Sequence, residues 1–159
     1  MSADLWPEAT VEQVVRLRAM AAGIPGSAFV EVHIPAPFEL VWAVASDLER
    51  ELPHFVDDVR TVQLVHGDAD RAEALIRGYS GFRARFAVVL RPGWCVMQSH
   101  FVIGGMAATA TEAGTRFAFL GAARLPFSRA ASPVLSAVGT ALAKRTTKRF
   151  ERCVERRLT

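Results

Sequence analysis

Apolar and polar residues alternate through the middle of the chain with the two-residue period of β-strands. The clearest case is FRARFAVVLR, residues 82–91, which places its phenylalanines on one side and Arg83 and Arg85 on the other. Comparable segments continue to about residue 125, and short turns rich in glycine, proline or aspartate separate them. Strands joined by such turns form an antiparallel meander. The pattern therefore predicts six consecutive strands, preceded by an earlier strand at residues 28–36.

One of the predicted turns lies at Gly104 and Gly105, in the sequence IGGMAA. Two adjacent glycines are typical of a tight turn, and nothing around them resembles a phosphate-binding loop. Residues 94–103 are accordingly predicted to form one strand, and residues 106–112 the next.

Helical spacing of apolar residues marks the two ends of the chain and the segment after the first strand. A first helix is predicted before Gly23, a second opens at Pro37, and a shorter amphipathic piece turns back at Pro53. The final helix runs from Ser132 to about Leu158, with an apolar stripe opposite its basic residues. A curved antiparallel sheet has one face to bury, and this long helix is the element available to cover it. The chain is thus predicted to be an α+β protein.

Six or seven strands curled around one helix leave a space that side chains do not fill. Burying two unpaired guanidinium groups would be costly, so Arg83 and Arg85 are expected to face solvent and the opposite face of that strand to face the space. The residues that this pattern places along the space, with Ser99 as one polar group, are Phe86, Val88, Leu90, Met97, Ser99, Phe101 and Phe119. The alternative is that these residues fill a solid core.

The composition is that of a single globular domain. The chain has 159 residues, of which 51% are hydrophobic and 22% charged, and no apolar run approaches the ~18 residues that span a bilayer. The first residues carry acids where a secretory signal would carry lysines, so the predicted location is cytoplasmic. Cys95 and Cys153 have no metal-binding spacing and are interpreted as small buried hydrophobes in a reducing compartment.

Positive charge is concentrated near the C-terminus. Residues 144–157 hold seven Lys or Arg and two Glu, a local net charge of +5, whereas the whole chain carries +3. Such a segment favours weak contact with an anionic membrane, although a solvated helix face is the simpler interpretation. No nucleic acid partner is predicted.

Catalytic and cofactor motifs are absent from the sequence. There is no GxSxG, P-loop or GxGxxG, and the four histidines are too dispersed for a metal pattern, so no cofactor and no metal are predicted. His54 follows Pro53 near the expected cavity mouth, where an imidazole is able to act as a general base.

The segment IPAPFELVWAVASDLERELPHFVDDVRTVQLV resembles the opening of the polyketide cyclase/dehydrase and lipid-transport superfamily, also called START-like or SRPBCC proteins. GTRFAFLGAARLPF is similar to the last strand of these proteins, and KRTTKRFERCVERRL to their closing helix. The closest resemblance is to bacterial polyketide aromatase/cyclases. It implies a helix-grip domain over residues 28–159. Residues 1–27 would then be an N-terminal helical extension that lies across the cavity mouth or mediates a homodimer.

The resemblance also bears on catalysis. In the cyclases two arginines and a tyrosine help to orient the polyketide, and the matching positions here are Leu90, Phe101 and Val59, all apolar. A shift of one residue in this match would make Arg91 the surviving cation. The same comparison adds Val59 and Met106 to the residues expected to bind a ligand, and Phe55 is expected to bind it as well.

Three functional hypotheses follow. The first is binding of a hydrophobic small molecule, such as a polyketide, lipid or isoprenoid, in an internal cavity. The second is a polyketide aromatase/cyclase or dehydratase that acts on a poly-β-ketone intermediate, with Arg91, His54 or Ser99 as its polar groups. The third is a membrane- or partner-docking module that uses the basic helix at residues 144–157.

Overall fold

The computed structural model describes residues 11–65, 67–68, 70–123 and 132–159, with side chains from residue 138 onward in the last range. Four helices and seven strands are assigned within these ranges. The helices are α1 (Gln13–Ala22), α2 (Phe38–Ser46), α3 (Leu48–Phe55) and α4 (Ser132–Leu158). The strands are β1 (Ala28–Ile34), β2 (Thr61–Val65), β3 (Arg71–Arg77), β4 (Arg83–Arg91), β5 (Trp94–Gln98), β6 (Val102–Thr111) and β7 (Gly114–Ala123).

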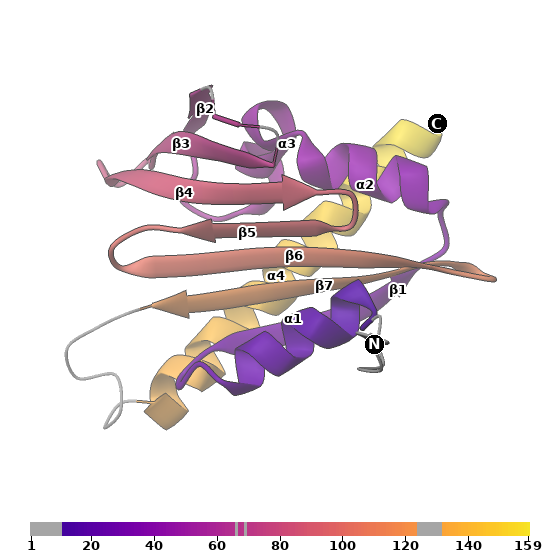
Figure 1. Cartoon of the computed structure of the whole chain (residues 1–159), viewed down its shortest axis with the longest axis horizontal. Coiled ribbons are helices and arrows are strands. Elements are labelled where there is room, and N and C mark those ends of the chain that lie inside the picture. The colour runs from indigo at the N-terminus through magenta and orange to yellow at the C-terminus, as the bar shows by residue number, and fades with distance from the viewer. Residues whose placement is uncertain (1–10, 66, 69, 124–131) are drawn as a thin grey trace, which may run out of the picture.

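All seven strands form one antiparallel sheet in the order β1-β7-β6-β5-β4-β3-β2. Six strands follow one another as a meander, and β1 adds to the edge of the last of them. Figure 1 shows the sheet with the long helix α4 running obliquely along one side and α1 on the other. The predicted α+β architecture, a curved sheet around a long C-terminal helix with an additional N-terminal helix, is confirmed.

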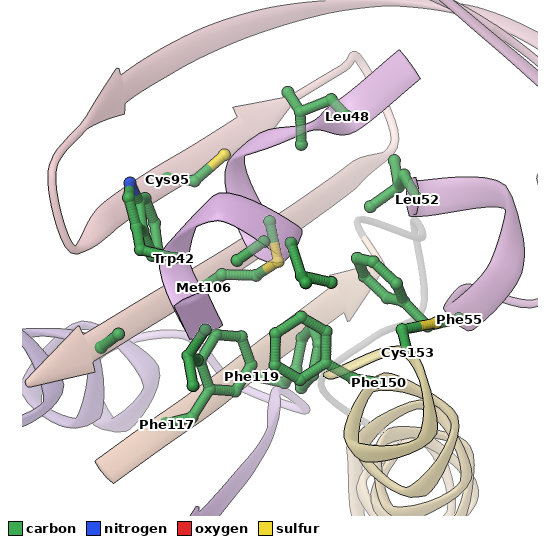
Figure 2. Packing of buried hydrophobic residues seen from close by; sticks show 14 of the residues in the cluster. Trp42, Leu48, Leu52, Phe55, Cys95, Met106, Phe117, Phe119, Phe150 and Cys153 are labelled. Atoms are coloured by element: carbon green, nitrogen blue, oxygen red, sulfur yellow. The ribbon is translucent and has the colours of Figure 1, made fainter. Parts of the chain in front are cut away.

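An aromatic cluster fixes the C-terminal half of α4 to the concave face of the sheet. Phe150 of α4 stacks on Phe117 of β7 with ring centroids 4.2 Å apart, and Phe55 of α3 meets Phe150 edge-on at 5.1 Å. All three side chains are fully buried. Figure 2 shows these rings together with Phe119, between the strands and the helices α3 and α4. This cluster, with Trp42 of α2, fills one half of the concave face with side chains.

The helix α1 packs on the convex face, opposite α4. Its buried residues Val14, Leu17 and Ala21 contact a patch of the sheet made by Ala107, Ala118 and Leu120. The expectation that this helix lies across the cavity mouth is therefore wrong, because the sheet separates it from the concave side.

The predicted turn at the paired glycines is also wrong. The chain turns instead at residues 99–101, where the Ser99 hydroxyl accepts hydrogen bonds from the backbone N–H groups of Val102 at 3.0 Å and Phe101 at 3.3 Å. The strand β6 then runs straight through both glycines. At Gly105 a Cβ would lie 2.9 Å from a Leu17 methyl group, so glycine allows α1 to approach the strand.

Two prolines sit differently from their predicted places. Pro37 precedes α2 as its N-cap, with φ −60° and ψ 147°, and the helix begins one residue later. Pro53 lies inside α3 instead of ending it. Pro53 lacks an N–H and so removes one hydrogen bond of the helix, which ends two residues later at Phe55. Helical spacing still carries Leu52 and Phe55 into the core. None of the helices in the described part of the chain is long and apolar enough to cross a membrane.

Candidate functional site

A cavity of about 530 Å³ lies on the concave side of the sheet, beside the half of that face that the aromatic cluster fills. Its sheet wall is built by residues of six strands, and the larger side chains among them are Ile76, Phe86, Cys95, Met97, Met106 and Phe119. Its helical wall comes from the end of α3 and the middle of α4, through Leu52, Val56, Val138, Leu142, Ala143 and Thr146. The lining is therefore mainly hydrocarbon.

Two glycines account for the space. Gly104 of β6 and Gly121 of β7 are directly paired on neighbouring strands, and both line the cavity. A Cβ built on either glycine would meet nothing within 4 Å. Side chains at these two positions would point from the sheet into the cavity, since Met106 and Phe119, two residues away along the same strands, also line it. The cavity thus exists because side chains are missing from its floor.

The helix α4 stays close to one edge of the sheet only. Gly139 of α4 is so near β1 that a Cβ there would lie 3.1 Å from the Cβ of Ala28. Next to Gly139 on the helix, Val138 and Leu142 line the cavity and remain 55% and 45% exposed. The apolar stripe of α4 therefore changes role along its length: near Phe150 it is buried in the core, and toward the N-terminal end it borders the cavity.

Two carboxylates from the segment between α3 and β2 line the cavity. Asp58, with φ 58°, accepts hydrogen bonds from the backbone N–H of Ser80 at 2.8 Å and from its hydroxyl at 2.5 Å. These hydrogen bonds lower the pKa of the Asp58 carboxyl, and the bond from the Ser80 hydroxyl contributes most. Asp57 accepts a hydrogen bond from Arg149 at 2.5 Å and lies 3.5 Å from Arg145. Both carboxylates are thus held in place by side chains that do not themselves line the cavity.

The thiol of Cys95, which lines the cavity, is unreactive. Cys95 of β5 is fully buried, and desolvation raises its pKa to about 12. A thiol in that state stays protonated at neutral pH and is a poor nucleophile. In the described residues no group of three or more His, Cys, Asp or Glu side chains is placed to hold a metal ion.

Half of the sequence-predicted lining residues border this cavity: Val59, Phe86, Met97, Met106 and Phe119. Val88 and Leu90 point the same way as Phe86, but they lie farther along β4, where the core is filled. Phe55 is buried in the aromatic cluster.

The remaining two predicted lining residues, Ser99 and Phe101, belong to the turn between β5 and β6. Phe101 is 56% exposed, so its expected place on an inward strand face is wrong. The strand ends at Gln98 and alternation stops there, which is the physical reason for the difference. Arg83 and Arg85 are exposed, as the alternation predicted.

The three candidate catalytic residues do not border the cavity. Arg91 is at the far end of β4, where it pairs with Asp70 at 3.1 Å. The hydroxyl of Ser99 is engaged by the turn. His54 is exposed and lies in a separate, polar groove of about 680 Å³ beside the C-terminal end of α4, with Arg152 and Glu155.

Several cavity residues escaped the sequence analysis. Gly104 was assigned to a turn and Gly121 was not singled out, although small residues recur at these points of two neighbouring strands. Leu52, Val138 and Leu142 belong to helical apolar stripes, and a stripe alone does not distinguish a packed residue from one that borders a cavity.

The basic segment of α4 is partly neutralised. Arg145 and Arg149 pair with Asp57, and Arg157 lies 2.9 Å from Glu51 and 3.7 Å from Asp47. Three of its seven cations thus have acidic partners in the described structure, which weakens this helix as a membrane-binding surface.

No protein-family model matches the chain, and no curated protein matches it. Solved structures do. A Thermus thermophilus protein of known crystal structure is 18% identical, with a TM-score of 0.64 over 84% of this chain and 99% of its own. The Zhui aromatase/cyclase of a Streptomyces species is 16% identical, with a TM-score of 0.62 over 84% of this chain and 95% of its own.

The di-domain aromatase/cyclase StfQ from the steffimycin biosynthetic pathway is 11% identical, with a TM-score of 0.63 over 89% of this chain and 55% of its own. At such identities the likeness establishes the fold alone. The predicted helix-grip fold is confirmed: this chain has the fold that these aromatase/cyclases share.

Proposed function

We propose that the protein binds a hydrophobic small molecule, such as a polyketide, lipid or isoprenoid, in the cavity between the sheet and α4. The observation that carries this proposal is the floor made by Gly104 and Gly121, where open space replaces two core side chains. Glycine inside a strand weakens the strand and contributes no apolar burial. Two glycines paired on neighbouring strands beside an apolar space are best explained by a ligand that occupies the space.

Size and chemistry support the same proposal. About 530 Å³ lies within the ~300–1,000 Å³ range of small-molecule pockets, which typically combine apolar walls with a few polar groups. Here the polar side chains in the lining are Asp57, Asp58 and Thr146. Both cysteines are buried and unpaired, which supports a reducing, cytoplasmic location as part of this proposal.

Thermal denaturation with a panel of aromatic and lipidic compounds tests the proposal. A ligand at about 100 times its Kd stabilises the folded state by about 2.7 kcal/mol, which raises Tm by about 5–10 °C for a chain of this length. The double variant Gly104→Val and Gly121→Val fills the floor of the cavity and should abolish the shift. Ala110→Val adds similar bulk to an exposed position of β6 and should leave it unchanged. The absence of any shift in the wild-type protein across the panel would refute the proposal.

Aromatase/cyclase activity is the second candidate, and the shared fold with Zhui and StfQ is the observation that favours it. The carboxylates of Asp57 and Asp58 are the ionisable groups that would meet a poly-β-ketone in the cavity. The test adds the protein to a minimal polyketide synthase and compares the products. Cyclisation in this cavity is supported if the wild-type protein and Arg91→Ala both change the products and the glycine double variant does not. It is refuted for that substrate if the wild-type protein leaves the product distribution unchanged.

A further inference from the structure

Large apolar side chains are exposed at the end of the sheet where Phe82, Val138 and Leu142 border the cavity. The five that form this group, called here the mouth rim, are Tyr79, Phe82, Phe101, Val138 and Leu142. Tyr79 is 74% exposed, and all five count among the nine exposed large hydrophobic residues of the described chain. Phe82, Val138 and Leu142 also line the cavity itself.

The fold brings the mouth rim together at one end of the sheet. In an antiparallel meander alternate turns lie at the same end, so the β3–β4 turn at residues 78–82 and the β5–β6 turn at residues 99–101 are neighbours. Figure 1 shows both turns on the left, at the end where β7 finishes and the early part of α4 lies. Three segments that are distant in the sequence thus expose apolar side chains at one opening.

Three unpaired arginines stand at the same end, where Arg77 and Arg83 leave the sheet on the face opposite the cavity, next to the turn between β3 and β4. Arg77 and Arg83 are directly opposite each other in the β3–β4 ladder, and the backbone N–H of Arg60 donates to the carbonyl of Arg77 at 2.8 Å. In the described structure none of the three forms an ion pair, whereas Arg85 and Arg91 of the same strand β4 pair with acids. Like charges facing each other across strands are destabilising. An external anion would remove that cost.

We propose that the mouth rim and these three arginines dock the protein on an anionic lipid bilayer, with the cavity opening toward the lipid. Apolar and aromatic side chains enter the interfacial region, while guanidinium groups pair with lipid phosphates in a bidentate manner. The two contributions act together, as stable binding to a membrane surface requires. A bilayer is able to contact all side chains of the mouth rim at once, whereas a protein partner would have to cover the cavity opening beside the mouth rim. Docking goes beyond ligand binding, because it does not depend on what fills the cavity.

Flotation with vesicles of phosphatidylcholine, with and without about one-third phosphatidylglycerol, measures this docking. The wild-type protein should partition onto the anionic vesicles and far less onto the neutral ones, and added salt should weaken the binding. Each arginine near an anionic surface contributes about fivefold to the partition coefficient, so Arg77→Gln with Arg83→Gln should reduce it about 30-fold. Arg85→Gln with Arg91→Gln is the matched control, since it removes the same charge from exposed arginines that have acidic partners. Its effect should be several times smaller.

A fluorescent reporter fixes the orientation of the protein on the membrane. Phe101→Trp places an indole on the mouth rim, and Val15→Trp places one on the exposed face of α1, on the other side of the sheet. Brominated lipids should quench the first indole more than the wild-type background, and should leave the second at that background.

Three outcomes would overturn the proposal. The first is no binding of the wild-type protein to anionic vesicles, and the second is equal weakening by the two arginine pairs. The third is a dimer in solution that dissociates in Tyr79→Ser with Phe101→Ser, because a second copy would then cover the rim. The double variant Gly104→Val and Gly121→Val separates this proposal from ligand binding. It should dock like the wild-type protein even though its cavity is filled.

Discussion

Replacing Phe150 with alanine tests whether the aromatic cluster holds α4 on the sheet and so defines the inner end of the cavity. Phe150 is fully buried and stacks on Phe117. It also meets Phe55 and Phe119 edge-on, at 5.1 and 5.7 Å. Phe119 in turn lines the cavity, so the cluster joins the packed half of the concave face to the open half.

The expected loss follows from burial and contacts. Truncating a fully buried phenylalanine to alanine costs about 3–5 kcal/mol, which includes the lost ring contacts. A chain of this length loses about 2–4 °C of Tm per kcal/mol, so Tm should fall by about 6–20 °C. Because domains unfold with about 5–15 kcal/mol, the variant should remain folded at room temperature.

Differential scanning calorimetry measures this loss directly. Leu158→Ala removes a half-exposed side chain from the same helix and should change Tm by no more than about 2 °C. If Phe150→Ala also stays within about 2 °C of the wild-type protein, the cluster does not hold the helix, and the inferred boundary of the cavity is wrong.

Three further predictions concern single groups. Ser80→Ala removes the hydrogen bond that most lowers the pKa of Asp58 below its ordinary value of 3.8, so urea denaturation should show a loss of stability at pH 7. A lowered folded-state pKa stabilises above the unfolded value, so the difference should vanish as the pH falls through the folded value; a difference that persists in strong acid would contradict this. In a variant whose other cysteine is serine, Cys95 should react with a disulfide reagent at pH 8 only after unfolding, because its pKa is about 12, and rapid reaction of the native protein would be evidence against its burial. Gly114→Ala should lower stability by about 1–3 kcal/mol, since Gly114 has φ 147° and its Cβ would lie 2.3 Å from a carbonyl oxygen of β1. Gly23→Ala, at a helix C-cap where a Cβ makes only ordinary contacts, should be nearly neutral in the same calorimetry. Equal effects of the two substitutions would refute the argument from strain.

Much of the fold was predictable because strand alternation is a local property. The pattern in FRARFAVVLR correctly separated the exposed Arg83 and Arg85 from the inward Phe86 and Val88. The boundary between β5 and β6 was not predictable in this way. Paired glycines are typical of turns, but here Gly105 allows contact with Leu17 of α1, a residue almost ninety positions away. The turn depends instead on a single serine hydroxyl.

The cavity was predictable in kind but not in place. Alternation identifies the concave face, yet it does not say which half of that face is filled. Leu90 and Phe86 share the same side of one strand, but the core packs against Leu90, while Phe86 borders open space. The difference depends on how far α4 stands from each strand, which is set by the contact of Gly139 with β1 and by the Phe150 cluster. No local pattern contains those distances.

Native mass spectrometry of the freshly purified protein tests the central claim most directly, because it detects any molecule that fills the cavity. The wild-type protein should carry a co-purified, organic-extractable compound, or take one up from the aromatic and lipidic panel. The double variant Gly104→Val and Gly121→Val should appear at its bare mass under the same conditions. A wild-type protein that stays at its bare mass with every compound, or a double variant that retains the same adduct, would contradict the account.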